Sequence, residues 1–444
     1  MAKSNSYDVI YKYIVRAELT DPMHIGSSAD TIEDILTHPV DGIPFIQASS
    51  IAGAFREQYQ SLFGKEETDF VFGKSELSEN SNASDYGSKV FFSDGQFEKT
   101  VIEYRPHVTI NRESGAAENG SKFNMEYLAP GSLFSFDLYL FADSALEVDN
   151  QGIEEIFKSI QAGDLQFGGQ KTKGCGYFKI RELRRKKFDM KTAEDRGLWM
   201  HEDDAEIQYD DLTKNVQSSE TRRAYRIKVF GKTEETILVK AVAAAMDTEK
   251  SPDSGNIKNG KKEFILPASS IKGTIRSHAE RIAAFLESNN RIASGEELIS
   301  QVFGRASKGE DKGVVGNARF FDAVLEDAKT HTAHRIHVDK FTGGVIDGAL
   351  FTEEEVCADK VVLSIDVEDK HEPDRTCGLL LLVLRDIALK SVNFGSGYNI
   401  GRGLIDVDTI ELTNNNGQKA VIDVKTKKIE DEQRIVKGVL AALN

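Results

Sequence analysis

Two aspartates in polar loops are the residues of this sequence best suited to chemistry. Asp34 lies 11 residues before Phe45, and Asp253 lies 11 residues before Phe264. A single loop carboxylate is usually just solvated, but equivalent placement in two halves of one chain favours a function. Beside a bound phosphodiester, such a carboxylate can orient a 2′-hydroxyl or hold a divalent cation. Asp34 and Asp253 are therefore the candidate catalytic residues.

The residue types alone leave the choice of aspartate open. Further carboxylates lie close to both positions, namely Asp30, Asp41 and Asp247. Activity in both halves is equally open at this point.

Two similar segments predict helix starts that can bind anions. They read ASSIAGAFR from residue 48 and ASSIKGTIR from residue 268. A helix start offers unpaired N–H groups and a favourable dipole, and serines add hydroxyls. The alternative is plain N-capping with glycines that only aid packing. The candidate anion-binding residues here are Ser49, Ser50, Arg56, Ser269, Ser270, Lys272 and Arg276.

Two glycine clusters follow later, at residues 166–180 and 393–407. A dinucleotide-binding fingerprint must follow a strand and open a helix, whereas these glycines follow predicted helices and precede predicted strands. Glycines also let a loop approach a phosphate backbone closely. Lys171, Lys173 and Arg402 lie inside the clusters and are candidates to pair with phosphates. A structural turn with solvated lysines is the alternative.

Metal clusters and common hydrolase motifs are not indicated. His331, His334 and His337 would fall on both faces of a strand, which is poor geometry for zinc. The 3 cysteines are scattered without CxxC spacing, so we expect reduced, mostly structural thiols. No Walker A motif, nucleophile elbow or HExxH motif occurs in the sequence.

Composition describes a soluble, acidic protein. The chain has 444 residues and a net charge of −16, which argues against non-specific nucleic-acid binding over its whole surface. A local basic groove remains compatible with this charge, because screening limits charge effects to roughly 10 Å. We see no membrane-spanning stretch and no signal peptide, so we expect a cytoplasmic protein.

An internal repeat sets the expected architecture. Ala48 matches Ala268, Phe63-Gly64 matches Phe303-Gly304, and Arg105 matches Arg335, always in the same order. Each copy predicts strand, helix, two strands, helix and strand, which is the ferredoxin-like pattern. The predicted fold class is α+β, with two tandem ferredoxin-like (RRM-like) domains at residues 1–210 and 211–444. A polar, acidic stretch at about 195–222 is the expected boundary.

The sequence from HIGSS to ASSIAGAFR resembles the start of the RAMP superfamily backbone subunits of type III CRISPR effector complexes. The helix start and the glycine-rich loop typical of that family both appear twice, similar to a type III-D tandem fusion. The resemblance implies a thumb insertion in each domain. It also implies partners: a guide RNA, a complementary target RNA and other RAMP-type subunits.

The resemblance further implies cleavage of target RNA by a loop aspartate between the first strand and first helix. Asp34 and Asp253 occupy that loop, and such cleavage would require Mg²⁺. Two alternatives stand beside this hypothesis. One is a non-catalytic RNA-binding scaffold of the same complex, and the other is a nucleotide-binding metabolic enzyme.

Overall fold

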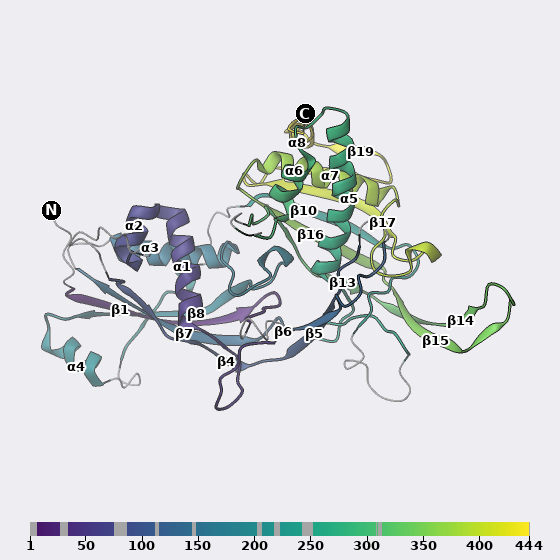
Figure 1. Ribbon diagram of the computed structural model, residues 1–444. Coiled ribbons are helices and arrows are strands. Elements are labelled where there is room, and N and C mark those ends of the chain that lie inside the picture. The colour runs from purple at the N-terminus through teal and green to yellow at the C-terminus, as the bar shows by residue number, and fades with distance from the viewer. Residues whose placement is uncertain are drawn as a thin grey trace. The chain divides into compact units, whose positions relative to one another are not determined.

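The chain forms two compact units (Figure 1). Unit 1 holds residues 1–102, 127–169 and 175–221, and unit 2 holds residues 103–126, 170–174 and 222–444. Two segments of the first sequence repeat therefore belong to unit 2. The computed structural model describes residues 7–26, 34–74, 87–111, 115–143, 148–201, 207–216, 223–241, 252–307, 309 and 313–443.

Unit 1 is built on an antiparallel sheet with the strand order β2-β4-β7-β1-β8-β9, and β3 also pairs with β7. Alternation in the sequence explains the strands: in β7, every second residue from Phe134 to Ala142 is buried. The strands are β1 (Val9–Leu19), β2 (Phe45–Ile46), β3 (Val90–Phe92), β4 (Gly95–Lys99), β7 (Leu133–Ala142), β8 (Phe178–Asp189) and β9 (Asp210–Asp211).

Helices cover both faces of this sheet (Figure 1). Phe55 of α1 and Phe157 of α3 pack with Phe136 of β7 in the main core. On the opposite face, Trp199 of α4 packs against Phe188, with 5.3 Å between ring centroids. The acidic stretch predicted as a boundary thus begins with a packed helix. The helices are α1 (Ala48–Phe63), α2 (Lys65–Phe72), α3 (Val148–Ala162) and α4 (Ala193–His201), followed by the 3-10 turn η2 (Thr213–Val216).

Unit 2 repeats this plan with the strand order β11-β13-β16-β10-β17-β18-β19, and β12 also pairs with β16. The strands are β10 (Arg223–Thr233), β11 (Ile265–Leu266), β12 (Ala318–Phe320), β13 (Ala323–Glu326), β16 (Lys360–Glu368), β17 (Ile405–Asn414), β18 (Lys419–Asp423) and β19 (Lys428–Glu430). The helices are α5 (Ala268–Ser288), α6 (Gly295–Phe303), α7 (Pro373–Ala388) and α8 (Ile435–Ala441).

The predicted fold class is confirmed in both units. The four main strands run in the order second, third, first, fourth, with antiparallel neighbours, as β4-β7-β1-β8 and as β13-β16-β10-β17. A two-stranded hairpin is inserted between the second and third main strands of each repeat. The hairpins are β5 (Ile102–His107) with β6 (Phe123–Leu128), and β14 (Lys329–Val338) with β15 (Val345–Cys357).

Two details of the repeat differ from the sequence prediction. The β-branched and aromatic residues at 224–244 predict one strand, but the strand ends at Thr233. Arg56 donates to the carbonyls of Phe72 and Gly73, and Arg276 donates to the carbonyl of Gly304. The counterpart of Phe303-Gly304 is therefore Phe72-Gly73 rather than Phe63-Gly64. No helix in the described part of the chain is long and apolar enough to cross a membrane.

Candidate nucleic-acid interface

Each repeated helix starts against an aspartate at an equivalent position. The Ala48 N–H donates to Asp94 Oδ1 at 2.7 Å, and the Ala268 N–H donates to Asp322 Oδ1 at 2.8 Å. These carboxylates already stabilise the positive end of each helix. The neighbouring serines stay accessible: Ser49 and Ser50 are exposed, and Ser269 and Ser270 are half-buried. The hydroxyls, rather than the first helical N–H, are the groups available to an external anion.

The repeated arginines of these helices have structural partners. Arg56 Nη2 lies 2.5 Å from Asp69 Oδ1, in addition to its carbonyl contacts. Arg276 Nε lies 3.1 Å from Glu280 Oε1, and its Nη1 donates to the Gly304 carbonyl at 3.3 Å. Both arginines tie the first helix of a repeat to the turn that ends the second, so their repetition is explained by packing.

The two glycine loops have the same backbone. Each contains a 3-10 turn, η1 (Lys171–Lys173) or η4 (Tyr398–Ile400), between left-handed residues. Each is closed by a glycine that no other residue can replace. At Gly176 (φ +88°) and Gly403 (φ +82°), a Cβ atom would lie 2.0 Å from the carbonyl oxygen of Phe167 or Phe394. The duplicated glycines are therefore required by the close approach of the backbone to itself.

Both glycine loops are anchored to the segment that follows the first strand of their repeat. The Gly169 N–H donates to the His24 carbonyl, and the Ser396 N–H donates to the Leu238 carbonyl, each at 2.9 Å. This segment leads to the loop that carries the candidate aspartate.

A cluster of positive charge forms within unit 2 where η1 meets the start of α5. Lys272 Nζ donates to Thr172 Oγ1 at 2.8 Å and to the Phe303 carbonyl at 3.0 Å. Burial, and then repulsion from nearby cations, lowers the pKa of Lys272 to about 7. Those cations are Lys173, Arg276 and Arg319.

This cationic cluster joins residues that the sequence placed in different repeats. Lys173 comes from the glycine loop of the first repeat, and Lys272 comes from the helix start of the second. Lys171 lies half-buried in the same 3-10 turn. Ala52 stands at the position of Lys272 in the first repeat, so this cluster is specific to unit 2.

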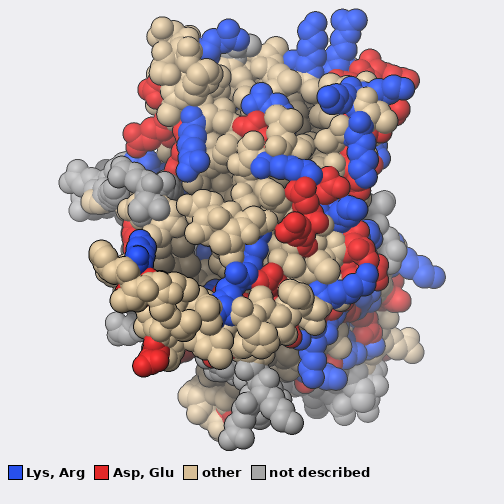
Figure 2. All heavy atoms as spheres, turned by 90° about the vertical axis from the view of Figure 1, so that its right-hand side faces the viewer, with Lys and Arg blue, Asp and Glu red and all other residues tan. Residues whose placement is uncertain are grey.

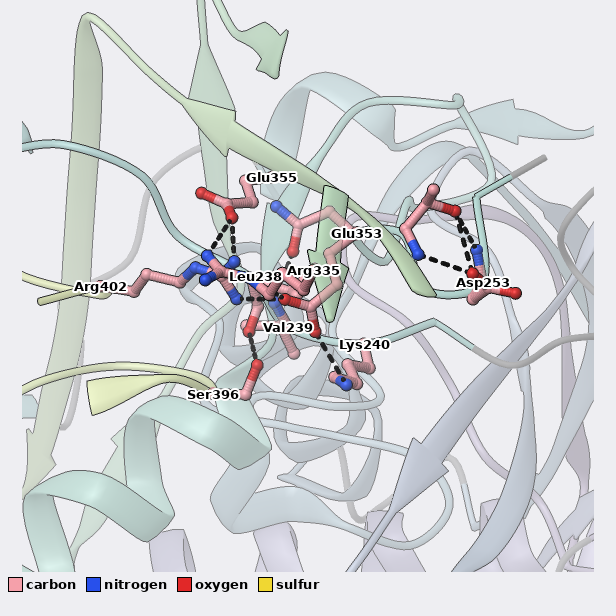
Figure 3. A network of polar contacts seen from close by, with 11 residues as sticks. Leu238, Val239, Lys240, Asp253, Arg335, Glu353, Glu355, Ser396 and Arg402 are labelled. Atoms are coloured by element: carbon pink, nitrogen blue, oxygen red, sulfur yellow. Dashed lines mark hydrogen bonds and ion pairs between the residues drawn. The ribbon is translucent and has the colours of Figure 1, made fainter. Parts of the chain in front are cut away.

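Arg402, in contrast, is buried in a network of ion pairs (Figure 3). Its Nη1 lies 2.8 Å from Glu353 Oε2, and its Nη2 contacts Glu355. Arg335 of β14 contacts both carboxylates at 3.0 Å, and Lys240 Nζ lies 3.2 Å from Glu353. Desolvation opposes ionisation of Glu353, but hydrogen bonds from Arg402 and Lys240 keep its pKa below the usual value. The charge of Arg402 is thus matched inside the protein.

The two candidate aspartates are both exposed but differ in their surroundings. Asp253 Oδ2 accepts the N–H of Thr352 at 2.6 Å and its hydroxyl at 3.0 Å. These hydrogen bonds lower the pKa of Asp253, so the carboxylate is ionised at neutral pH. Asp34 has no hydrogen-bond donor among the residues that the structure describes.

Of the alternative aspartates, the structure describes Asp41. Asp41 Oδ1 accepts the N–H of Ile43 at 2.9 Å and so shapes its own turn. Asp30 and Asp247 lie outside the described residues. Counted from the helix starts, Asp34 precedes Ala48 by 14 residues and Asp253 precedes Ala268 by 15.

The described residues contain no group of three or more His, Cys, Asp or Glu side chains that could hold a metal ion. A magnesium ion needs no such group when it keeps several waters and binds one carboxylate together with substrate phosphates. Asp253 fits this kind of site, because both of its hydrogen bonds from Thr352 reach Oδ2 and leave Oδ1 without a partner in the described structure.

Runs of basic residues in β8 and β10 are largely paired with carboxylates. In β8, Arg181 pairs with Glu18 at 2.7 Å. In β10, Arg223 and Arg226 both lie 2.8 Å from the buried Asp366. Figure 2 shows one face of the molecule, where basic side chains lie among acidic ones. These runs stabilise the sheets and are poor candidates for phosphate binding.

Sequence reasoning missed several polar residues of unit 2. Arg105 is buried, and its Nη1 lies 2.7 Å from Asp322 Oδ2 while it also pairs with Glu103. Glu353 and Glu355 were not among the predicted site residues. Their spacing of two residues in a strand was the available signal, since it places both on one face.

The chain contains two ferredoxin-like folds in tandem. Each has an inserted hairpin and a closed glycine loop before its last strand, so the class is that of proteins with a duplicated ferredoxin-like domain. The family model of the RAMP superfamily matches residues 16–179 and 239–406. The chain therefore belongs to the RAMP superfamily.

One curated relative is the CRISPR system Cmr endoribonuclease Cmr4 of Pyrococcus furiosus, 27% identical over 146 residues. The match covers 32% of this chain and 49% of Cmr4, so the chain spans about half the length of that relative. A chain from the cryo-EM structure of the Type III-B Cmr-beta bound to cognate target RNA also matches. It is 17% identical with a TM-score of 0.31, covering 40% of this chain and 60% of that one.

Proposed function

We propose that this chain is an RNA-binding backbone subunit of a type III CRISPR effector complex, with endoribonuclease activity toward a complementary target RNA. Membership of the RAMP superfamily and the similarity to Cmr4 support the class of complex. The observation that carries the RNA-binding part is the cationic cluster around Lys272, where a glycine loop meets a helix start. The proposed partners are a guide RNA, the target RNA and other RAMP-type subunits.

Guide RNA is held through its phosphates in this proposal. Lys171, Lys173 and Lys272 supply positive charge, and the hydroxyls of Ser269 and Ser270 donate hydrogen bonds beside them. A bound phosphate also relieves the repulsion among the cations of the cluster. Sequence is then read by base pairing between guide and target rather than by the protein.

Cleavage is assigned to the loop aspartates. The ionised Asp253 presents its free Oδ1 to the target strand, where it orients a 2′-hydroxyl or binds a cation. Mg²⁺, when bound, would neutralise charge that develops on the phosphate. A carboxylate with a lowered pKa is a weak proton acceptor, so holding a cation suits Asp253 better than general-base catalysis. Asp34 is the corresponding candidate in the first repeat.

The test is cleavage of a labelled target RNA by the assembled complex with matching guide RNA and Mg²⁺. We expect Asp34→Ala and Asp253→Ala each to remove one distinct cut, and the double variant to remove both. Asp41→Ala tests the alternative loop aspartate that the structure describes, which accepts the N–H of Ile43, and we expect it to leave both cuts unchanged. Unchanged cuts in the double variant would favour the rival proposal, a non-catalytic scaffold that holds the same RNA.

A further inference from the structure

We propose that Thr352 is a positioning residue for the Asp253 carboxylate. This inference rests on the proposed function, because it assumes that Asp253 takes part in cleavage. Thr352 lies on β15 of the inserted hairpin, and Asp253 lies 99 residues earlier, in the loop before α5.

Two donors from one residue fix the orientation of the carboxylate. The Thr352 N–H and hydroxyl both reach Asp253 Oδ2, at 2.6 and 3.0 Å. In return, the Asp253 N–H donates to Thr352 Oγ1 at 3.1 Å. A carboxylate held through one oxygen points its other oxygen in a defined direction. The contact with Thr352 therefore aligns the Asp253 side chain, although it is exposed, as a reacting group requires.

The backbone on both sides of this contact is also paired. The Glu354 N–H donates to the Ser254 carbonyl at 2.8 Å, and the Ser254 N–H donates to the Thr352 carbonyl at 3.2 Å. The aspartate loop therefore pairs with β15 at an isolated parallel bridge between Ser254 and Glu353. Asp253 cannot move far without breaking these bonds.

β15 itself is fixed by the ion-pair network that follows Thr352 (Figure 3). Glu353 and Glu355 are 5% and 4% exposed and contact Arg335 and Arg402. Arg402 belongs to the glycine loop that precedes β17. Three elements of unit 2 thus converge on one stretch of β15: the aspartate loop, the strand β14 and the glycine loop.

The first repeat lacks this arrangement in its described residues. The buried Cys175 stands where Arg402 stands in the second glycine loop, and it brings no positive charge. No described residue donates a hydrogen bond to Asp34.

The experiment measures single-turnover cleavage of target RNA by the assembled complex, with rates recorded separately for each cut. Thr352→Val removes the hydroxyl and keeps the shape of the side chain. It should slow the Asp253-dependent cut by roughly 10- to 100-fold at saturating RNA, in the cleavage step itself, because misalignment of a reacting group is costly. Thr352→Ser restores the hydroxyl and should return the rate to within about threefold of wild type.

The hairpin offers a matched control. Asp339 Oδ1 accepts the N–H and hydroxyl of Thr342 at 2.7 and 3.0 Å, which is the same contact at another exposed site. Thr342→Val should leave both cuts unchanged. A second readout needs no cleavage: amide hydrogen exchange at Thr352, in the full chain without RNA, should speed up in Asp253→Ala.

The outcomes separate the two proposals. If Asp253→Ala leaves every cut unchanged, the proposed catalytic role of Asp253 fails. If Asp253→Ala abolishes a cut while Thr352→Val cleaves at the wild-type rate, only the positioning role fails. Equal slowing by Thr352→Val and Thr352→Ser would also overturn it, because the hydroxyl would then be irrelevant.

Discussion

Unit 1 and unit 2 differ most clearly around two equivalent aspartates. Asp94 and Asp322 each accept the N–H at the start of a repeated helix. Asp94 is otherwise exposed, whereas Asp322 also pairs with the buried Arg105, which comes from the hairpin of the first repeat. The aspartate at the helix start is therefore exposed in unit 1, whereas in unit 2 it also contacts a buried arginine.

This difference separates what the fold requires from what was added to it. Glycines with close backbone approaches and aspartates at helix starts occur in both units. The cationic cluster at Lys272 and the network at Arg402 occur in unit 2, and their described counterparts in unit 1 are Ala52 and Cys175. Among the described residues, the charged clusters at Lys272 and Arg402 are therefore confined to unit 2.

The largest effect is expected from Arg402→Ala. This substitution leaves Glu353 and Glu355 buried without their main partner, and breaking a buried ion pair costs about 3–5 kcal/mol. Chemical denaturation should show the transition of unit 2 at lower denaturant concentration and that of unit 1 unchanged. Cys175→Ala at the equivalent position should cost about 1 kcal/mol, since it removes a single buried sulfur. Similar losses from both variants would contradict the contrast between the units.

Substitutions in the glycine loops should destabilise both units to a similar extent, because the backbone of the two loops is the same. Gly176→Ala and Gly403→Ala each place a Cβ against a carbonyl oxygen at positive φ. Each should cost at least about 2 kcal/mol, from left-handed strain and overpacking. The measurement is the unfolding midpoint of the affected unit. A neutral effect at one position would mean that only one loop is tightly closed.

Much of this architecture could be predicted from sequence, since it depends on local patterns. A high content of β-branched and aromatic residues predicted the strands, helical spacing predicted α1 and α5, and the repeat predicted two copies of one fold. Boundaries were harder where a segment is acidic yet amphipathic, as in α4, whose Trp199 covers the second face of a sheet.

The candidate site was predicted only in part, because its key contacts are long-range. Thr172 and Lys272 are 100 residues apart, and Asp253 and Thr352 are 99 apart. No local pattern links such pairs. Arg402 was proposed for phosphate binding on residue type and place, but burial between two glutamates depends on how β15 packs. The matched pair of catalytic aspartates stays a prediction.

Replacing the equivalent aspartates by asparagine sharpens the comparison. Asparagine keeps an oxygen for the helix N–H, so Asp94→Asn should change stability by less than about 0.5 kcal/mol. Asp322→Asn removes the negative charge next to Arg105 and should cost about 1.5–2 kcal/mol. Thermal unfolding of each variant provides the measurement. Equal losses would show that the Arg105 contact adds little to the helix start.

The smallest effect concerns the pH dependence of RNA binding. Lys272 is mostly charged at pH 6 and mostly neutral at pH 8, because burial and neighbouring cations lower its pKa to about 7. Loss of one cation beside a phosphate should weaken guide-RNA binding by about three- to tenfold over this range at fixed salt.

Lys272→Arg keeps its charge at both pH values, so its affinity for guide RNA should be the same at pH 6 and pH 8. Lys272→Met has no charge there, so its affinity should also be the same at both pH values but as weak as that of the wild type at pH 8. Because Ala52 occupies the equivalent position, the first repeat has no side chain there that titrates in this range. If the affinity of the wild-type protein does not change between pH 6 and pH 8, the bound phosphate lies away from Lys272. The two helix starts would then not differ in how they bind RNA.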